Sequence, residues 1–374
     1  MAVDMNADWA SDARRLGSAE FRGVRARSPV ECIDVAREGH RLAQGGFWVV
    51  VAEFDGSQRA WRFAEVEYEA DGAVAHDSGE RREWSGPPAN AWHTSMDHHQ
   101  YVAGVGNIRS AIREGDVYQV NLCRVMTADL RASIPGPDAV ALSHTLATGN
   151  PARFASRIVI PPIAGDAGVW VVSASPELYL GIEGDTVSSA PIKGTAAPGE
   201  AMLPKDEAEN VMITDLIRND LSHVSVPGSV RVPEFLAEHQ HPGLWHLQST
   251  VVATIAPEYD WTGRMWPALL RDTFPPGSVS GAPKTAALGV IAREERARRG
   301  PYCGGIGWID ADRRRAELAV GIRTFWWTPD AGGRLHFGTG AGITWGSNPE
   351  GEWSETELKA RRLIALASSD RMSL

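Results

Sequence analysis

The chain has 374 residues, 43% of them hydrophobic and 22% charged, which is the composition of a globular protein and excludes a disordered chain. Its formal net charge of −10 at pH 7 argues against general attraction to nucleic acid or to an anionic membrane. No apolar run reaches the roughly 20 residues of a membrane-spanning helix. The acidic start MAVDMNADWASDARR lacks the apolar centre of a secretory signal, and three widely separated cysteines show no metal-binding or disulfide pattern. We therefore expect a reduced, cytoplasmic protein.

The first half of the sequence is rich in strand patterns. Residues 47–54 (FWVVVAEF) and 61–68 (WRFAEVEY) predict two strands paired as a hairpin. A helix is predicted over residues 101–114, and the next stretch, GDVYQVNLCRVM, alternates roughly as a strand does. Further strands are predicted in RIVIPP and in VWVVSASPELYLGIEGDTVSSAPIKGT, where Gly-Asp marks a turn.

From residue 204 the hydrophobic period becomes helical, in PKDEAENVMITDLIRNDLSHV. Strands are then predicted in GSVRVPEF and HLQSTVVATI, and SGAPKTAALGVIAREERARRG predicts a helix from near Pro283 to Gly300. Three late strands (GGIGWIDA, RAELAVGIRTFWW and GRLHFGTGAGITWG) precede a terminal helix in NPEGEWSETELKARRLIALAS. Because strands and helices mix without regular βαβ alternation, we predict an α+β fold with largely antiparallel sheets. Nothing after about residue 100 marks a domain boundary.

Two predicted helices carry acidic residues on one face. Asp206 and Glu209 are three residues apart, and Glu352, Glu355 and Lys359 are spaced in the same way. Carboxylates from two helices could together bind a hard divalent cation such as Mg²⁺. From spacing alone, the favoured interpretation is the more ordinary one, in which acids near helix starts face solvent and stabilise the helix dipole.

Several polar residues interrupt apolar strand patterns. Arg323 in AVGIRTFWW, His246 in LWHLQST and Glu177 in ASPELYL would each need a partner if buried. For each alone, a satisfied internal pair is the simpler interpretation. The turn GTGAGI does not fit a dinucleotide-binding motif, since no βαβ context follows. The loop PPGSVSGAPK could equally be an anion-binding helix start or an ordinary tight turn.

These pieces occur in a particular order along the chain: GDVYQVNL, SASPELYL, PIKGT, DEAENVMITDLIRNDL, PGSVRV, HLQSTV, FPPGSVSGAPK, RRGPYCGGIGW, GIRT, GAGI and EWSETELKA. This order resembles that of the chorismate-utilising enzymes, which include anthranilate synthase large subunits, isochorismate and salicylate synthases, and aminodeoxychorismate synthase component I. The resemblance implies large antiparallel sheets packed as a sandwich with helices outside. It also implies a single catalytic domain over residues 1–374, with a variable part over 1–100 and the core motifs over 101–365.

Within the resemblance, the motif PIKGT is informative. The position before Gly-Thr is usually alanine in anthranilate and isochorismate-type synthases and lysine in aminodeoxychorismate synthases, where it is a nucleophile. Lys193 thus implies that chorismate is converted to 4-amino-4-deoxychorismate, on the route to p-aminobenzoate and folate. Lys193 would attack carbon 2, the hydroxyl at carbon 4 would leave, and ammonia would enter at carbon 4. A lysine with an ordinary pKa of about 10.4 is rarely neutral at pH 7. We therefore expect burial and a nearby divalent cation to lower the pKa of Lys193.

Glu177 matches the family glutamate that handles protons at the departing hydroxyl, a role that requires a raised pKa. Because a single lysine selects this reaction, an anthranilate synthase component I or an aminodeoxyisochorismate-type synthase is the enzymatic alternative. The non-enzymatic alternative is a scaffold that has lost catalytic activity and only binds a partner. The presence of Lys193, Glu177, Arg323 and the acidic positions speaks against it.

The resemblance implies the rest of the site as well. Glu209 and Glu355 would bind Mg²⁺ directly, and Asp206 and Glu352 would act through water or at longer range; Asp206 stands where several relatives have glutamate. The other residues implied to contact the substrate are Arg323 and Tyr302 at the enolpyruvyl carboxylate, the backbone of Gly340, Ala341 and Gly342 at a carboxylate, and Gly194, Thr195, His246, Ser280 and Lys359. Since the chain has no room for a fused amidotransferase, we expect a separate glutamine amidotransferase subunit to supply ammonia.

Overall fold

The computed structural model describes residues 17–69, 82–162, 166–196, 202, 204–241 and 244–369. Within these residues, 18 strands form one hydrogen-bonded sheet, and the pairings between them are antiparallel. In spatial order its main path runs through β12 (Arg231–His241), β13 (Leu244–Thr254), β10 (Thr186–Ala190), β9 (Leu178–Glu183), β16 (Arg315–Val320), β15 (Gly305–Asp310), β3 (Phe47–Ala52), β4 (Gln58–Tyr68), β2 (Val24–Asp34), β1 (Ser18–Phe21), β7 (Phe154–Ile160), β8 (Val169–Ser175), β17 (Thr324–Thr328), β18 (Arg334–Ile343) and β6 (Gln119–Asp129).

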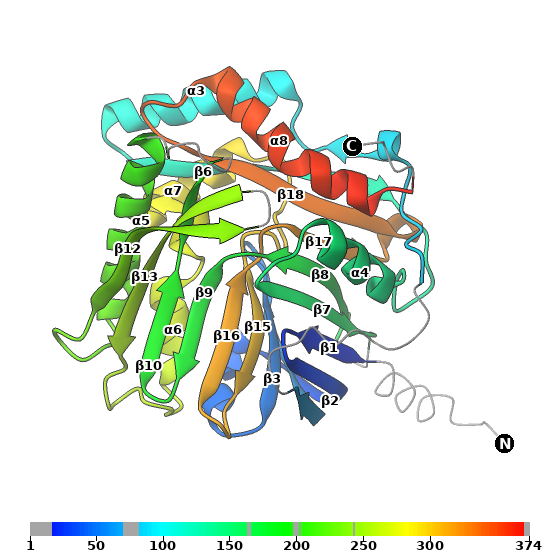
Figure 1. Ribbon diagram of the computed structural model, residues 1–374, viewed down its shortest axis with the longest axis vertical. Coiled ribbons are helices and arrows are strands. Elements are labelled where there is room, and N and C mark those ends of the chain that lie inside the picture. Colours follow the sequence, from blue (N-terminus) through cyan, green and yellow to red (C-terminus); the bar gives the residue numbers. More distant parts are fainter. Residues whose placement is uncertain are drawn as a thin grey trace.

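Three shorter strands pair at the ends of this path. β11 (Ile192–Ala196) pairs with β13, and β5 (His93–Thr94) and β14 (Gly281–Ala282) pair with β6. The sheet curls, so that β9, β16, β15 and β3 stand upright in the lower half of Figure 1 while β18, β8 and β7 cross obliquely to them. One large apolar cluster fills the space that the curled sheet and its helices enclose. The predicted α+β class with antiparallel sheets is confirmed.

Helices cover the sheet from outside. They are α2 (Val35–Glu38), α3 (His98–Glu114), α4 (Ala139–Gly149), α5 (Pro204–Ser222), α6 (Met265–Thr273), α7 (Lys284–Glu294) and α8 (Pro349–Ala367), with 3₁₀ turns η1 (Gly39–Ala43), η3 (Ala89–Ala91), η4 (Gly277–Val279) and η5 (Asp330–Gly332). Figure 1 shows α3 and α8 across β6 and β18, and α5 beside β13 and β12. A second apolar cluster joins α4 and α8 to β7, β8, β17 and β18.

Most elements lie where the sequence predicts them. The hairpin of β3 and β4, helices α3, α5 and α8, and the late strands are all present. The helix predicted over 101–114 begins earlier, at His98, because the Asp97 side chain and Gln100 form a reciprocal cap. The helix predicted to end at Gly300 ends at Glu294. Beyond it the chain turns so that Glu295 and Arg299 enter the core.

The strand predicted over RAELAVGIRTFWW is in fact two strands. β16 ends at Val320 and pairs with β15 and β9, whereas β17 starts at Thr324 and pairs with β18 and β8. Arg323 lies in the turn between them with φ of 52°. A continuous apolar run conceals such a break because both strands are buried, so the prediction that Arg323 lies within a strand is wrong.

The N-terminal part of the chain is integral to the sheet. β3 pairs with β15, and β1 pairs with both β2 and β7. These strands join the half of the sheet that carries β9–β13 to the half that carries β6 and β18. Residues before 101 and the core motifs over 101–365 therefore contribute strands to the same sheet.

Helix α8 is fastened to β6 by a buried arginine. Arg124 is 2% exposed, lies 4.2 Å from the Trp353 ring centroid, donates to Thr356 Oγ1 at 3.1 Å and forms an ion pair with Glu357. Asn348 caps the start of α8, where its side chain accepts from the Gly351 N–H. These contacts fix the helix that carries two of the predicted metal ligands.

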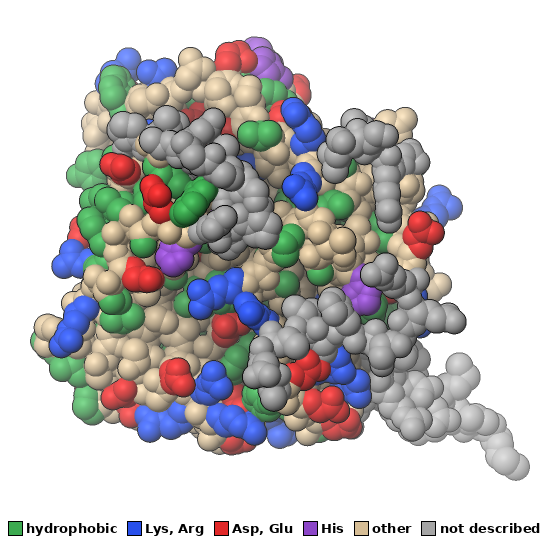
Figure 2. All heavy atoms as spheres, in the orientation of Figure 1, with side chains coloured by type: hydrophobic (Ala, Val, Ile, Leu, Met, Phe, Trp, Pro, Cys, Tyr) green, Lys and Arg blue, Asp and Glu red, His purple; other side chains and the backbone are tan. Residues whose placement is uncertain are grey.

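The surface is mixed in charge. On the face shown in Figure 2, acidic and basic side chains are interspersed and do not gather by sign, so this face lacks the broad basic surface of a nucleic-acid-binding protein. Among the described helices, none has both the length and the apolar character needed to cross a membrane.

Candidate active site

Lys193 lies on β11, where the strand is irregular. The pairing of β11 with β13 shifts between Lys193 and Thr195, and Gly194 is the extra residue, with φ of 82°. A Cβ on Gly194 would come within 2.7 Å of the Asp206 side chain, so glycine here allows α5 to approach closely. The half-buried Lys193 donates from Nζ to the backbone oxygen of Ser278 at 2.8 Å. This contact brings β11 and η4 together at one point.

Glu177 lies between β8 and β9 and is 4% exposed. Its backbone oxygen accepts from the Val320 N–H at 3.0 Å. Burial raises the pKa of Glu177 to about 7, although Ser278, Lys193 and Arg323 each favour the charged form. A raised pKa is the condition that the role implied for Glu177 requires. A carboxyl group with such a pKa can both give and take a proton near neutral pH.

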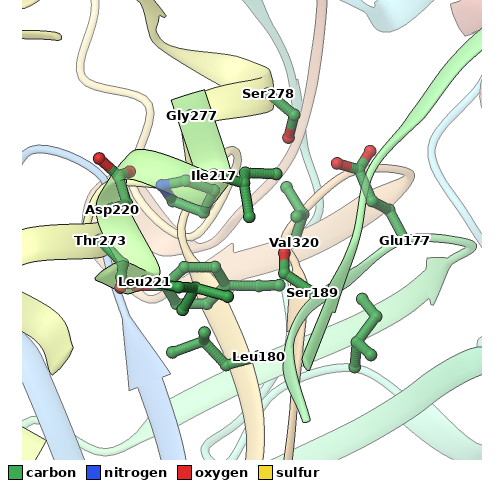
Figure 3. A pocket seen from close by; sticks show the side chains of 13 residues that line it. Glu177, Leu180, Ser189, Ile217, Asp220, Leu221, Thr273, Gly277, Ser278 and Val320 are labelled. Atoms are coloured by element: carbon green, nitrogen blue, oxygen red, sulfur yellow. Dashed lines mark hydrogen bonds between the residues drawn. The ribbon is translucent and has the colours of Figure 1, made fainter. Parts of the chain in front are cut away.

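Glu177 borders a pocket. Figure 3 shows Glu177 at one side of this pocket and Asp220 at the other, with Ile217, Leu221 and Val320 between them. The Ser278 hydroxyl lies on the side of the Glu177 carboxyl group. Neither Lys193 nor Arg323 lines this pocket. We therefore regard it as the apolar surroundings of Glu177 and not as the binding site for an anion.

Arg323 is held beside the end of β8 by its backbone. Its oxygen accepts from the Ala174 N–H at 3.0 Å, and its φ of 52° is unusual for a residue with a side chain. Burial lowers the pKa of Arg323, and Glu177 opposes that effect. Within the described residues its guanidinium makes no hydrogen bond and no ion pair. A largely buried cation without such a partner is suited to bind an anion from outside the protein.

Ser278 is a residue that the sequence did not single out. Its backbone oxygen accepts from Lys193, and its side chain favours the charged form of Glu177. The loop PPGSVSGAPK that carries it forms η4 and then β14 before α7 begins. Lys284 at the start of α7 pairs with Asp220 at 2.8 Å. The predicted site residue Ser280 is fully buried, and its hydroxyl donates within this turn to the Pro276 oxygen at 3.0 Å.

The loop is clamped from behind by Arg299, which is 1% exposed. Its guanidinium donates to the Val279 oxygen at 2.8 Å, to the Asn121 oxygen at 2.7 Å and to both carboxylate oxygens of Glu295. Four bonds from one buried side chain thus tie η4, β6 and the end of α7 together. Arg299 positions Ser278 without touching Lys193 or Glu177.

We expect Arg299→Met to lower the free energy of unfolding by about 3–5 kcal/mol, because Glu295 is left as an unpaired buried carboxylate. Urea unfolding measures the change. Arg218→Met is the matched control, since Arg218 also pairs with an acid nearby in the sequence, Asp215 at 2.8 Å, but is half exposed. That control should change stability by less than about 1 kcal/mol. If both variants lowered the free energy of unfolding by the same small amount, Arg299 would not be what holds the loop in place.

The four predicted metal ligands lie on α5 and α8, and two of them, Glu209 and Glu355, interact electrostatically with Lys193. Burial raises the pKa of Glu209; Lys193 and Lys205 oppose this, whereas Glu355 and Asp206 add to it. At Glu355 burial acts in the same direction, but the nearby lysines, Lys359 foremost, lower its pKa overall. Glu209 and Glu355 thus influence one another across the two helices, and Lys193 acts on both.

A lysine lies between these acids. Lys205 Nζ is 2.7 Å from Glu352 Oε1 and 3.7 Å from Glu209 Oε1. Glu352 is 3% exposed, and its other oxygen, Oε2, is buried without a hydrogen-bond partner. The described residues contain no group of three acidic, histidine or cysteine side chains that already surrounds one point. Hard carboxylate oxygens and an unsatisfied one suit Mg²⁺ chemically, but no ready-made metal site is present among the described residues.

The glycine-rich part of β18 has an edge without a strand partner among the described residues. β17 pairs with β18 only as far as Phe337, and the other edge of Gly338–Ile343 has no strand partner among the described residues. Alternate N–H groups of Gly340, Ala341 and Gly342 can therefore bind a carboxylate. A Cβ on Gly342 would lie 3.3 Å from Glu209 Oε2. Lys359 Nζ donates to the Gly340 oxygen at 3.2 Å and pairs with Glu355 at 2.6 Å.

The remaining predicted residues are placed as follows. His246 is 2% exposed on β13 and faces Thr195 across the strand pair; the Thr195 side chain lies outside the described part of the structure. Tyr302 is buried, and its hydroxyl accepts from the Cys123 thiol at 3.9 Å. Burial raises the pKa of Tyr302. Within the described residues, no hydrogen bond joins Tyr302 to Arg323 or Lys193.

Electrostatic influences thus connect Glu177 with Lys193 and Arg323, and Lys193 with Glu209 of α5 and Glu355 of α8. This arrangement offers two cations for an anionic substrate, a carboxyl group that titrates near neutrality, and oxygen donors for a hard cation. It can bind a carboxylate-bearing molecule and transfer protons to it.

Comparisons with known proteins agree with this description. The sequence model of the chorismate binding enzyme family matches residues 50–365, a match that begins earlier than the motifs do. Anthranilate synthase component 1 of Saccharolobus solfataricus is 30% identical over 85% of this chain and 76% of its own length. Aminodeoxychorismate synthase component 1 of Klebsiella aerogenes is 34% identical over 74% of this chain, which covers only 59% of that protein.

A solved structure extends the agreement to the fold. The menaquinone-specific isochorismate synthase of Escherichia coli aligns with a TM-score of 0.74 over 98% of this chain and 92% of its own, at 17% identity. The resemblance drawn from the ordered motifs is confirmed, since the family match covers most of the sheet and both acidic helices. This chain belongs to the chorismate-binding enzyme family.

Proposed function

We propose that this protein is the component I of an aminodeoxychorismate synthase, which converts chorismate and ammonia to 4-amino-4-deoxychorismate. One observation carries the proposal. Lys193 Nζ donates to the Ser278 backbone oxygen, and its charge acts on Glu177, whose pKa burial raises to about 7. A nucleophilic amine beside a proton-transferring carboxyl group is what substitution through a lysine adduct requires.

In the proposed reaction the amine of Lys193 forms a bond to carbon 2 of chorismate. The ring double bonds shift, and the bond from carbon 4 to its hydroxyl breaks. Glu177 gives its proton to that hydroxyl, which leaves as water. Ammonia then forms a bond to carbon 4, the double bonds shift back and Lys193 departs from carbon 2. Glu177, now a carboxylate, takes the surplus proton. Chorismate and ammonia thus give aminodeoxychorismate and water.

The other residues would bind and orient the substrate. Arg323 and the free edge of β18 would hold carboxylates of chorismate. Glu209 and Glu355, with Asp206 and Glu352 nearby, would hold Mg²⁺, which when bound neutralises the ring carboxylate. A glutamine amidotransferase subunit would supply ammonia. The component 1 names of the relatives support a partner of this kind.

A second function is an anthranilate synthase component I, or an aminodeoxyisochorismate-type synthase. The relatives include an anthranilate synthase component 1 at nearly the same identity as the aminodeoxychorismate synthase. In that reaction the amine would enter at carbon 2, the position that Lys193 itself is proposed to attack. The presence of the lysine therefore favours amination at carbon 4.

The product decides between them. Purified protein would be incubated with chorismate, Mg²⁺ and concentrated ammonium at pH 8 to 9, and the product identified by mass and ultraviolet spectrum with and without an aminodeoxychorismate lyase. We expect a non-aromatic amine that the lyase converts to p-aminobenzoate. Anthranilate with pyruvate would favour the second function. No consumption of chorismate would contradict both and favour a scaffold.

The role of Arg323 can be tested separately. We expect Arg323→Gln to raise the KM for chorismate roughly 10- to 100-fold with an unchanged fold, since a charge-assisted hydrogen bond is worth about 1.5–3 kcal/mol. Arg323→Lys should recover only part of this loss, because lysine cannot bind a carboxylate through two parallel bonds. Steady-state kinetics and circular dichroism measure both effects. An unchanged KM in Arg323→Gln would remove Arg323 from the substrate site.

A further inference from the structure

Lys205 occupies a special position among the acids of α5 and α8. It is in the first turn of α5, and its ammonium reaches across to α8 to pair with Glu352 at 2.7 Å. It is also 3.7 Å from Glu209, one turn further along its own helix. Its side chain is 37% exposed. One end of the side chain is therefore fixed by the helix, while its charged end can move to solvent.

Glu352 explains why a cation is needed there. The residue is 3% exposed, one oxygen binds Lys205, and the other is buried without a hydrogen-bond partner. A buried carboxylate without a compensating charge costs several kcal/mol. Lys205 compensates part of this charge and leaves one oxygen unsatisfied. A divalent cation with oxygen ligands would satisfy it more fully.

We propose that Lys205 is a built-in competitor of the metal, which pairs with Glu352 and Glu209 while the site is empty and must withdraw before Mg²⁺ can bind. This inference rests on the proposed magnesium site. The absence of a converging group of three acids among the described residues agrees with it, because the acids are arranged around an ammonium group. Metal binding is then an exchange of cations, and its apparent affinity is reduced by the fraction of protein in which Lys205 is paired.

The exchange predicts opposite effects of one substitution. Lys205→Met keeps the length of the side chain and removes its charge. We expect the variant to have a lower melting temperature than the parent protein without metal, because Glu352 loses its partner. We expect it to bind Mg²⁺ at least about tenfold more tightly, because nothing competes. Mg²⁺ should also raise its melting temperature by more than that of the parent protein.

Isothermal titration of MgCl₂ into protein without chorismate measures the affinity. Lys205→Arg should bind Mg²⁺ about as the parent protein does, because it keeps a competing cation. Arg218→Met, which removes a half-exposed cation from the same helix, should change neither quantity. In a double-mutant cycle with Glu352→Gln, most of the effect of Lys205→Met on Mg²⁺ affinity should disappear.

An Mg²⁺ affinity of Lys205→Met that equals or falls below that of the parent protein would overturn the inference. So would the same gain in Arg218→Met, which would indicate a general effect of net charge. Product formation by the parent protein, measured in parallel, tests the proposed function. Its failure would count against aminodeoxychorismate synthesis, whereas equal Mg²⁺ affinities would count against Lys205 alone.

Discussion

Lys193→Ala is expected to reduce the formation of aminodeoxychorismate from chorismate and ammonia by roughly 10³-fold or more, as removal of a catalytic nucleophile does. The amine is proposed to form a bond to carbon 2, and the alanine side chain has no group that could form it. The fold should survive, because within the described residues the Lys193 ammonium makes a single hydrogen bond, to the Ser278 oxygen. Product yield by mass spectrometry and unfolding by urea separate the two effects.

Lys193→Arg distinguishes a nucleophile from an ion-pair partner. Arginine keeps the positive charge beside Glu177 and can still reach a backbone oxygen, but it is always protonated and does not attack carbon. We expect it to be as inactive as alanine. If the Lys193→Arg variant kept an activity within about tenfold of that of the parent protein, Lys193 would be shown to act through its charge. In addition, parent protein incubated with chorismate and Mg²⁺ without ammonia should gain the mass of chorismate less one water.

Glu177→Gln is expected to lower activity roughly 10²- to 10⁴-fold, the usual contribution of general acid–base catalysis, and to stabilise the fold at alkaline pH. The pKa of Glu177 is about 7 in the folded protein and 4.5 as an ordinary glutamate. The folded state therefore binds the proton more tightly than the unfolded state does. The resulting loss of stability is absent below pH 4.5, grows as the pH rises to 7 and is complete above it.

The magnitude follows from the same difference. At about 1.4 kcal/mol for each pH unit, burial of the charged carboxylate costs on the order of 3 kcal/mol above pH 7. We expect Glu177→Gln to unfold at a higher urea concentration than the parent protein at pH 8, and near the same concentration at pH 4.5. Glu183→Gln, an exposed acid on β9, should show no such dependence. A stability difference that is the same at both pH values would mean that Glu177 is not destabilised by burial.

Some of the site follows from the sequence because it depends on local spacing. Glu209 and Glu355 lie on the helix faces that their spacing predicts, and α8 starts at Pro349 as expected. Burial of Glu177 also follows from its apolar neighbours. Arg323 was misplaced because its neighbours on both sides are strand residues, and a turn of three residues leaves no mark on the apolar pattern.

Other parts of the site depend on contacts that spacing cannot show. Lys193 meets Ser278 across 85 residues of sequence, and Lys205 meets Glu352 across 147. Neither contact has a local signal, because each is created by the way the sheet curls. The end of α7 at Glu294 could not be predicted either. In the sequence, Glu295 and Arg299 look like ordinary surface charges, and only the structure shows that they are buried.

The position of β3 in the middle of the strand path has a consequence for synthesis. Val50 pairs with Gly307, 257 residues later in the chain, and all six residues of β3 are buried. At about 5–20 residues per second, a ribosome needs roughly 13–50 s to deliver that partner. For this time the apolar edge of β3 is available to other chains. Nascent protein is therefore expected to depend on chaperones until β15 emerges, and overexpression at high temperature should yield aggregates whose formation begins at this strand.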